Sequence, residues 1–242
     1  PAPSVPFNQN RLLRNFRWFW DYAGGWMTDF GTHRLDTVQH VMNVEAPRTV
    51  VATGGRFTLK DGGEMPDVLQ VTYEYPGFIL SYETCNLNAH GLGGRTPGMA
   101  YYQARDKDDR PHGEAFYGTN GALFCDRIGF EIYPEPKATM RRDGLQNMNA
   151  PPEGYRMESK RVPAKDATDL HVKNFIDCVR SRQVPAAEVE IGHRSTAVAH
   201  LGNIAYKTRR KLTWDAVKEE FAGDREASAL LGRKARKPWD LI

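Results

Sequence analysis

A run of strand-like segments, enclosed by helical segments on both sides, is the feature that most restricts the possible folds. Residues 48–59, 67–77 and 78–88 are rich in β-branched and aromatic residues, and Pro76 and Gly77 predict a hairpin turn between the last two. Residues 114–136 contain three further short strand patterns. Helix, then strands, then helices is the order typical of an α+β domain. We therefore predict a large, mostly antiparallel sheet of at least five strands with helices packed on one face.

The second half of the chain adds two helical segments. Residues 166–183 begin with Asp and Thr, which favour helix starts, and residues 192–211 carry an apolar stripe of small residues. Residues 89–113 form a long polar, glycine-rich insertion, and residues 137–166 are mostly loop in character. No GxGxxG opens a helix after a strand, and no P-loop occurs. The sequence therefore shows no nucleotide-binding half.

Composition and charge narrow the classes of partner. The 242 residues carry a formal net charge of +3 and are 40% apolar, which is enough for a core. Basic residues gather at 207–211 and 232–237, where they read as solvated faces and not as a nucleic-acid surface. Cys85, Cys125 and Cys178 match neither a disulfide framework nor a metal motif. We expect neither nucleic acid nor a membrane as a partner.

The ends of the chain bear on domain organisation. The first ten residues hold three prolines and read as an extended linker, so a further N-terminal part is expected before it. We expect residues 1–15 to be this linker, residues 16–220 to be the α+β domain and residues 221–242 to be its C-terminal extension. No signal peptide or apolar run of ~20 residues occurs. The compartment, cytoplasmic or periplasmic, therefore stays open.

The segment GGWMTDFGTHRLDTVQHVM, residues 24–42, carries an unusual polar stripe. Asp29, His33, Asp36 and His40 are spaced by four, three and four residues, which places them on one face of a helix. Apolar residues recur at helical spacing through the same segment. We predict a helix that starts near residue 28 or 29 and ends at residue 43.

Glycines within and before this helix indicate close contacts. Gly31 interrupts the helical pattern at a cost of about 1 kcal/mol relative to alanine, which often marks the close approach of another backbone or a ligand. The pair Gly24–Gly25 would likewise let a substrate and another backbone come near.

Three interpretations of the polar stripe remain open from spacing alone. In a catalytic site, His33 would take or give a hydroxyl proton while hydride moves, and Asp29 one turn earlier would orient its ring. In a metal site, only two of the four could share one ion, because the stripe is ~16 Å long. In a structural face, the Asp–His pairs would be surface or interface hydrogen bonds.

The segment NFRWFWDYAGGWMTDFGTHRLDTVQHVM, residues 15–42, resembles the signature of the glucose–fructose oxidoreductase / inositol dehydrogenase / MocA family. In that family the second domain opens with a paired-glycine turn and a helix bearing Asp-x-x-x-His. Residues 116–124, 192–215 and 221–241 look like the same family. The resemblance implies a first, Rossmann domain that binds NAD or NADP and carries a Glu-Lys-Pro lysine. No Glu-Lys-Pro occurs here, and only the second domain is present.

The resemblance also implies roles for particular residues. Asp29 and His33 match the motif position by position, so His33 would accept the proton of the substrate hydroxyl while Asp29 orients it or binds a neighbouring hydroxyl. Asp36 is read as structural and His40 as a helix-face residue. The candidates for other contacts are Arg17 and Tyr22 for substrate, Trp18 for the cofactor, and His193, which begins a helix where a polyol hydroxyl could bind.

The resulting expectation is the substrate-binding and catalytic-base half of an NAD(P)-dependent oxidoreductase. Its substrate would be a sugar, polyol or glycoside, and its second domain would form a homo-oligomer through the sheet face. The chain on its own should be inactive, because NAD or NADP would bind mainly to the absent Rossmann domain. Two alternatives remain: a non-enzymatic binding or oligomerisation module that kept the fold, and a metal-dependent hydrolase or lyase that uses the Asp/His helix.

Overall fold

The chain forms two compact units in the computed structural model. Unit 1 comprises residues 1–93 and 187–242, and unit 2 comprises residues 94–186. This division is a feature that the sequence did not indicate. The structure describes residues 2–85, 87, 113–126, 129–140, 143–147, 150–164, 167–233 and 235–239. Most of the glycine-rich insertion at 89–113 therefore lies outside the described residues.

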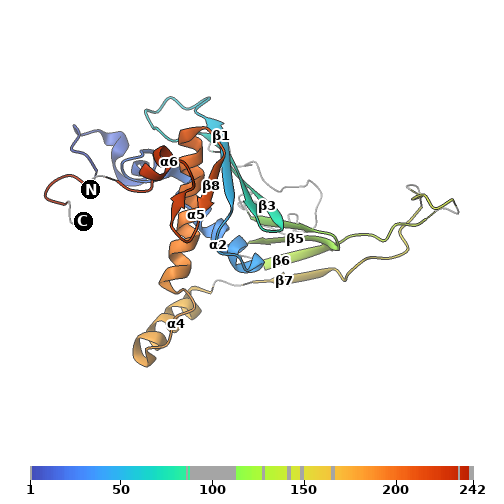
Figure 1. Ribbon diagram of the computed structural model, residues 1–242. Coiled ribbons are helices and arrows are strands. Elements are labelled where there is room, and N and C mark those ends of the chain that lie inside the picture. The colour runs from blue at the N-terminus through green and yellow to red at the C-terminus, as the bar shows by residue number, and fades with distance from the viewer. Residues whose placement is uncertain are drawn as a thin grey trace. The chain divides into compact units, whose positions relative to one another are not determined.

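Unit 1 is built on a five-stranded antiparallel sheet with the order β3-β2-β1-β8-β9 (Figure 1). The pairing of β2 with β3 runs to Tyr75 opposite Phe78, so the turn at Pro76 and Gly77 closes the predicted hairpin. Gly77 has a φ of +93°, a conformation that favours glycine. The strands are β1 (Thr49–Gly55), β2 (Val68–Tyr75), β3 (Phe78–Cys85), β8 (Leu212–Asp215) and β9 (Glu220–Phe221).

The helices of unit 1 come from both ends of the chain. In Figure 1, α5 in orange lies alongside β1, and α2 in blue packs against α5. α2 ends where Asn43 adopts the left-handed conformation, as its position in the sequence predicted. The helical elements are η1 (Gln9–Arg11), η2 (Leu13–Trp18), α1 (Gly25–Thr28), α2 (Phe30–Met42), α5 (Val189–Thr208) and α6 (Arg225–Ala229).

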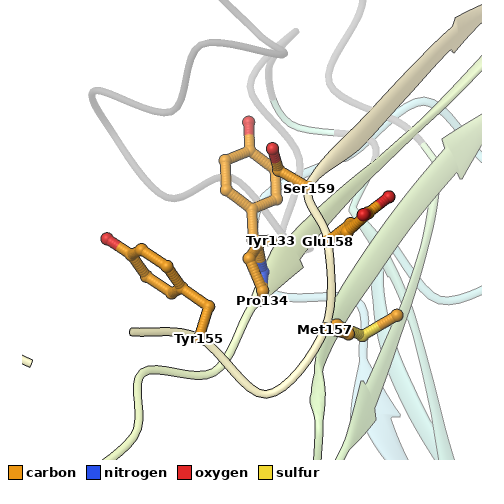
Figure 2. A pocket seen from close by; sticks show the side chains of 6 residues that line it. All are labelled: Tyr133, Pro134, Tyr155, Met157, Glu158 and Ser159. Atoms are coloured by element: carbon orange, nitrogen blue, oxygen red, sulfur yellow. The ribbon is translucent and has the colours of Figure 1, made fainter. Parts of the chain in front are cut away.

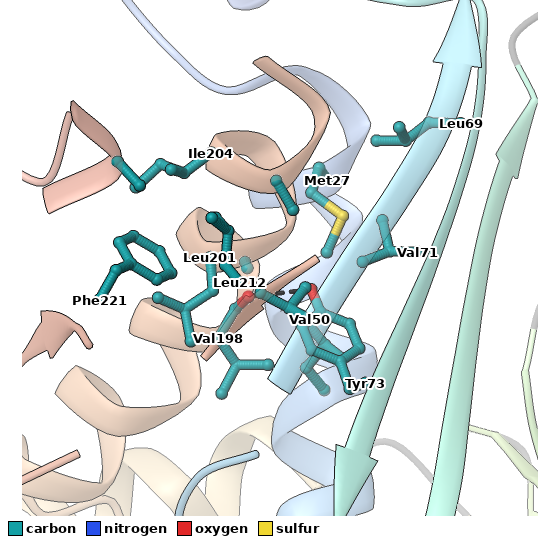
Figure 3. Packing of buried hydrophobic residues seen from close by; sticks show 14 of the residues in the cluster. Met27, Val50, Leu69, Val71, Tyr73, Val198, Leu201, Ile204, Leu212 and Phe221 are labelled. Carbon is teal, nitrogen blue, oxygen red and sulfur yellow. Dashed lines mark hydrogen bonds between the residues drawn. The ribbon is translucent and has the colours of Figure 1, made fainter. Parts of the chain in front are cut away.

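One face of this sheet is covered by the helices (Figure 3). Leu69, Val71 and Tyr73 alternate along β2 towards the helices and are at most 1% exposed. Met27 from α1 and Leu201 from α5 pack into the same cluster. Full burial of a side chain of this size stabilises the fold by about 1.5–3 kcal/mol. The predicted α+β fold, with a mostly antiparallel sheet and helices on one face, is confirmed.

Two polar contacts within this packing fix the position of α5. The buried Tyr73 hydroxyl donates to the carbonyl of Val198 at 2.9 Å. The Ser195 hydroxyl donates to a carboxylate oxygen of Asp36 at 2.6 Å, which joins α5 to α2. A tyrosine hydroxyl in a core would otherwise leave a buried polar group unsatisfied. The register of α5 on the sheet is therefore set by hydrogen bonds as well as by apolar packing.

A buried carboxylate holds the loop between β1 and β2. Asp67 is 1% exposed and accepts backbone hydrogen bonds from Phe57, Thr58 and Leu59 at 2.9–3.0 Å. Burial alone would raise the pKa of Asp67, but these backbone bonds and the nearby Arg56 guanidinium outweigh it, so the pKa lies below its usual value.

Unit 2 contains a four-stranded antiparallel sheet with the order β4-β5-β6-β7. Its three predicted strands are confirmed, but β7 lies within residues 137–166, which were predicted to be mostly loop. That strand is only four residues long, which is too short for its alternation to be recognised in the sequence, and among the described residues it pairs with β6. The elements are β4 (Glu114–Gly118), β5 (Gly121–Asp126), β6 (Gly129–Pro134), β7 (Lys160–Pro163) and α4 (Thr168–Ser181).

Two glycines of α5 test the close packing of this helix. A Cβ on Gly202 would lie 2.5 Å from the Tyr73 hydroxyl and 3.1 Å from the Met27 methyl carbon, whereas a Cβ on Gly192 would meet nothing within 4 Å. We expect Gly202→Ala to lower the free energy of unfolding by about 1–3 kcal/mol. Gly192→Ala should raise it by about 0.5–1 kcal/mol through helix propensity. Urea titrations followed by tryptophan fluorescence report on unit 1, since all five tryptophans lie there. Equal stability of the two variants would contradict the packing.

The lowered pKa of Asp67 predicts how the stability of the fold depends on pH. Because the folded-state pKa of Asp67 is lowered, its contribution is present above the unfolded-state pKa and is lost as the pH falls through the folded-state pKa. Asp67→Asn should lower the free energy of unfolding at pH 7 by roughly 2–4 kcal/mol, because three backbone donors lose a charged acceptor. Urea titrations at pH 7 and in acid should show the difference between wild type and variant shrinking as the pH falls. If the difference in the free energy of unfolding did not change with pH, the charge of the Asp67 carboxylate would not be the cause of the stabilisation.

Candidate functional site

The helix that carries Asp29 and His33 is interrupted at Asp29. α1 ends at Thr28 and α2 begins at Phe30, and Asp29 between them has a ψ of −81°. The predicted start near residue 28 or 29 is confirmed for α2. Asp29, however, lies at a junction of two helices, so the four polar side chains do not share one continuous helix as the spacing predicted.

The carboxylate of Asp29 is held by a guanidinium from the preceding segment. Arg17 Nε donates to Asp29 Oδ2 at 2.5 Å, and the two side chains are 29% and 33% exposed. Such a charge-assisted bond is short and directional. Asp29 and His33 do not hydrogen-bond to each other, so Arg17 and not His33 orients this carboxylate. Of the two roles expected for Asp29, the binding of a neighbouring hydroxyl is the one that this geometry leaves open.

His33 stands at the end of a row of aromatic rings. Its exposed imidazole meets the ring of Phe30 edge-on, with centroids 6.1 Å apart. Phe30 in turn meets Trp26, and Trp26 meets Trp18, each at 5.7 Å between centroids. The row runs from η2 through α1 to α2. It gives His33 an apolar flank and places Trp18, the expected cofactor contact, in the same row.

The interrupting glycine of the helix has a packing reason. A Cβ on Gly31 would lie 3.1 Å from the hydroxyl oxygen of Tyr82 on β3. That hydroxyl donates to the carbonyl of Trp26 at 3.3 Å. The close approach is made by a side chain of the sheet and not by the backbone or ligand that the sequence predicted, and Gly31 lets the start of α2 lie against β3.

The remaining polar residues of the stripe have simpler surroundings. Asp36 accepts a hydrogen bond from Ser195 and joins two helices, in keeping with its structural reading. His40 is exposed in the last turn of α2. Among the described residues no three His, Cys, Asp or Glu side chains gather as a metal-ligand set. The alternative of a metal-dependent hydrolase thus finds no ligand set in this part of the chain.

Tyr22 and His193, two of the expected substrate contacts, line a cavity of about 1010 Å³ in unit 1. Asp29, His33, Arg17 and Trp18 are not among its lining residues. The sequence-predicted site residues therefore fall into two groups, one at the helix junction and one around this cavity. The cavity walls also include Trp20, Gly24, Thr28, Thr196, His200, Asn203, Lys207, Trp214, Glu219 and Arg233.

His193 is paired across the rim of the cavity. Its Nε2 lies 2.5 Å from a carboxylate oxygen of Glu219, and both side chains are about half exposed. The hydrogen bond and the charge of Glu219 raise the pKa of His193 above its ordinary value. Glu219 lies 26 residues further along the chain, where no sequence pattern linked it to this histidine.

The paired glycines are explained by a residue that the sequence analysis did not single out. Asn203 is 5% exposed, and its Nδ2 donates to the carbonyl of Gly24 at 2.9 Å. A Cβ on Gly24 would lie 2.7 Å from that same nitrogen, and Gly25 adopts a φ of +64°. A polar amide within the apolar stripe of the later helix was the signal that could have identified Asn203.

A hollow of about 710 Å³ in unit 2 is lined by Tyr133, Pro134, Tyr155, Met157, Glu158 and Ser159, with a single charged side chain among the six (Figure 2). Glu158 is the carboxylate among these six residues, and the phenols of Tyr133 and Tyr155 are the other titratable groups. In the described part of the chain, every helix is too short or too polar to cross a membrane.

Comparison with known proteins identifies related sequences and folds. A family model described as "Oxidoreductase family, C-terminal alpha/beta domain" matches residues 1–74 and 156–241. No curated protein matches the chain. Similar solved structures are an NAD-binding protein from Listeria innocua (18% identity, TM-score 0.50), a protein assigned as an NADPH-dependent oxidoreductase from Desulfitobacterium hafniense (16%, 0.55) and an oxidoreductase from Thermotoga maritima (12%, 0.53).

The matches cover most of this chain but only about half of each solved structure. The three structures cover 88%, 84% and 88% of this chain, whereas the match takes up 56%, 52% and 51% of their own lengths. The chain therefore spans about half the length of the solved proteins that it resembles. At these identities the likeness concerns the fold.

The His193–Glu219 pair predicts a measurable titration. The folded-state pKa of His193 is raised, so the stability that the pair contributes is present below the unfolded-state pKa of about 6.5 and is lost as the pH rises through the folded-state pKa. Glu219→Gln should lower the pKa of His193, measured by NMR titration of its imidazole protons. Glu190→Gln should lower it less, because Glu190 acts only through space. An unchanged titration in Glu219→Gln would refute the pairing.

Proposed function

We propose, because this chain belongs to the glucose–fructose oxidoreductase / inositol dehydrogenase / MocA family of oxidoreductases, that it is the substrate side of an NAD(P)-dependent enzyme. The substrate would be a sugar, a polyol or a glycoside, and the reaction would interconvert one of its hydroxyl groups with a carbonyl. The family membership follows from the match of the C-terminal domain model over residues 1–74 and 156–241. The sequence-based prediction of the family is confirmed by that match.

The observation that carries the proposal is the pair of side chains at the helix junction. Arg17 fixes one oxygen of the Asp29 carboxylate at 2.5 Å and leaves the other oxygen for a substrate hydroxyl. His33, one turn further on, is exposed on the flank of the aromatic row and can reach a ligand. A neutral imidazole accepts the proton of the reacting hydroxyl in oxidation, and an imidazolium returns it in reduction.

The residues of this chain fit one end of a nicotinamide cofactor. The row formed by Trp18, Trp26 and Phe30 supplies flat apolar rings on which another flat ring can stack. The described residues contain no glycine-rich loop that opens a helix after a strand to cradle phosphates, so the dinucleotide would be held mainly by another domain. When bound, the nicotinamide accepts or donates a hydride. His33 would move the proton that balances this transfer.

The exposed face of the five-stranded sheet is the surface that we propose for self-association. Gln70, Thr72 and Glu74 of β2 alternate with the buried residues and point away from the helices. Val51 and Ile79, on the neighbouring strands, are 38% and 70% exposed on this side. A second copy could cover these apolar side chains, and the same sheet face would then form the homo-oligomer interface.

The proposed function makes a direct prediction for the complete protein. His33→Ala should lower the turnover number about 10²–10⁴-fold, the usual contribution of a general acid–base group. The affinity for NAD(P) should change little, because most of that binding would come from the other domain. The measurement is the rate of nicotinamide reduction with a panel of sugars, polyols and glycosides, together with cofactor binding by fluorescence.

A matched control comes from the same helix. His40 is exposed on α2 and has no role in the proposed chemistry, so His40→Ala should keep the wild-type turnover. The 242-residue chain alone should show no turnover with NAD or NADP. Full activity of the His33→Ala enzyme, or equal losses in the two variants, would overturn the assignment.

A further inference from the structure

The cavity of about 1010 Å³ lies along one side of α5. Its lining residues on that helix recur every three or four positions, so they share one helix face. The opposite wall comes from the segment after η2 and from the chain after α6. The volume is at the upper end of the range of about 300–1,000 Å³ that is typical of sites for small organic ligands. The α5 lining residues are His193, Thr196, Ala197, His200, Leu201, Asn203, Ile204 and Lys207.

Basic side chains gather at one end of this cavity. The ammonium group of Lys207 lies 4.0 Å from the centre of the Trp20 ring. Arg233 donates to the backbone carbonyls of Asp21 and Ala23, at 3.0 and 3.5 Å. Among the described residues, neither cation forms an ion pair with a carboxylate. The positive charge of this wall is therefore not neutralised by a direct partner.

The charge of Arg233 acts on two other basic groups at this wall, His200 and Lys207. Partial desolvation by the cavity walls lowers the pKa of His200, and the Arg233 charge lowers it further. The same two causes lower the pKa of Lys207, although Glu64 and Asp21 act in the opposite direction. The charges of Lys207 and Arg233 repel each other, and an anion between them would relieve that repulsion.

A buried acceptor lies on the wall of the same cavity. Asn203 uses its Nδ2 to bind Gly24, and its Oδ1 is buried with no hydrogen-bond partner among the described residues. An unsatisfied buried acceptor costs about 1–3 kcal/mol, so it favours a ligand that brings a hydroxyl donor.

We propose that this cavity binds a small hydroxylated anion, a sugar acid or a sugar phosphate. Its anionic group would lie among Lys207, Arg233 and His200, and a hydroxyl would bond to Asn203. The proposal goes beyond the oxidoreductase function, because it needs neither a cofactor nor the residues of the helix junction. It concerns a binding event that the 242-residue chain can perform by itself.

Isothermal titration calorimetry on the 242-residue chain tests the proposal at constant ionic strength. The probes are gluconate, glucose 6-phosphate, sorbitol and hexanoate. Gluconate or glucose 6-phosphate should bind saturably, and comparison of the two distinguishes a carboxylate from a phosphate ligand. Sorbitol lacks the charge and hexanoate lacks the hydroxyls, so each should bind at least about tenfold more weakly. Saturable binding of neither hydroxylated anion, or equal binding of sorbitol, would overturn the proposal.

Matched lysine variants place the binding in the cavity. Lys207→Gln should weaken the binding of the preferred anion at least about tenfold. Lys211→Gln removes the same charge four residues further on, where the lysine pairs with Glu74 and does not line the cavity, so it should leave binding unchanged. Thermal unfolding of each variant controls for folding, and His200→Gln provides an independent second change in the cavity. Undiminished binding in both the Lys207→Gln and the His200→Gln variants would refute this site.

Discussion

The hydrogen bond from Asn203 to the carbonyl of Gly24 is the contact on which the arrangement of the site depends. It joins two buried residues that are 179 positions apart in the sequence. A side chain at Gly24 would collide with the donor nitrogen, so the glycine and the amide require each other. Because loss of a buried partner costs about 1–3 kcal/mol, this bond fixes where α1 begins. The junction at Asp29 follows four residues later.

The helix α5, which provides Asn203, contacts the core on one side and the cavity on the other. One side of α5 packs Val198 and Ala205 into the core against the sheet, and its Val198 carbonyl receives the Tyr73 hydroxyl. The other side presents His200 and Lys207 to the cavity. A helix held on one side by a close-packed core presents its other side with little freedom of rotation. The proposed recognition of charge and hydroxyl groups would therefore depend on the apolar packing of the fold.

Periodicity predicted the elements well, because each depends on local pattern. The alternation along residues 68–75, the turn at Pro76 and Gly77, and the end of α2 at Asn43 all follow from neighbouring residues. Side-chain partners were not predictable in this way. Arg17 reaches Asp29 across the paired-glycine turn, and this distant contact replaced the expected bond to His33. The division into two units and the cavity likewise depend on contacts between segments remote in sequence.

We propose that His33, beside a carboxylate held by Arg17, accepts the proton of the substrate hydroxyl. The pH dependence of kcat/KM for substrate oxidation by the complete protein tests it most directly, because a general base must be unprotonated in the free enzyme. We predict that kcat/KM of the wild type falls in acid along a limb for a single ionisation. That limb should be absent from the residual activity of the His33→Ala enzyme. The same limb with the same midpoint in both proteins would contradict the claim.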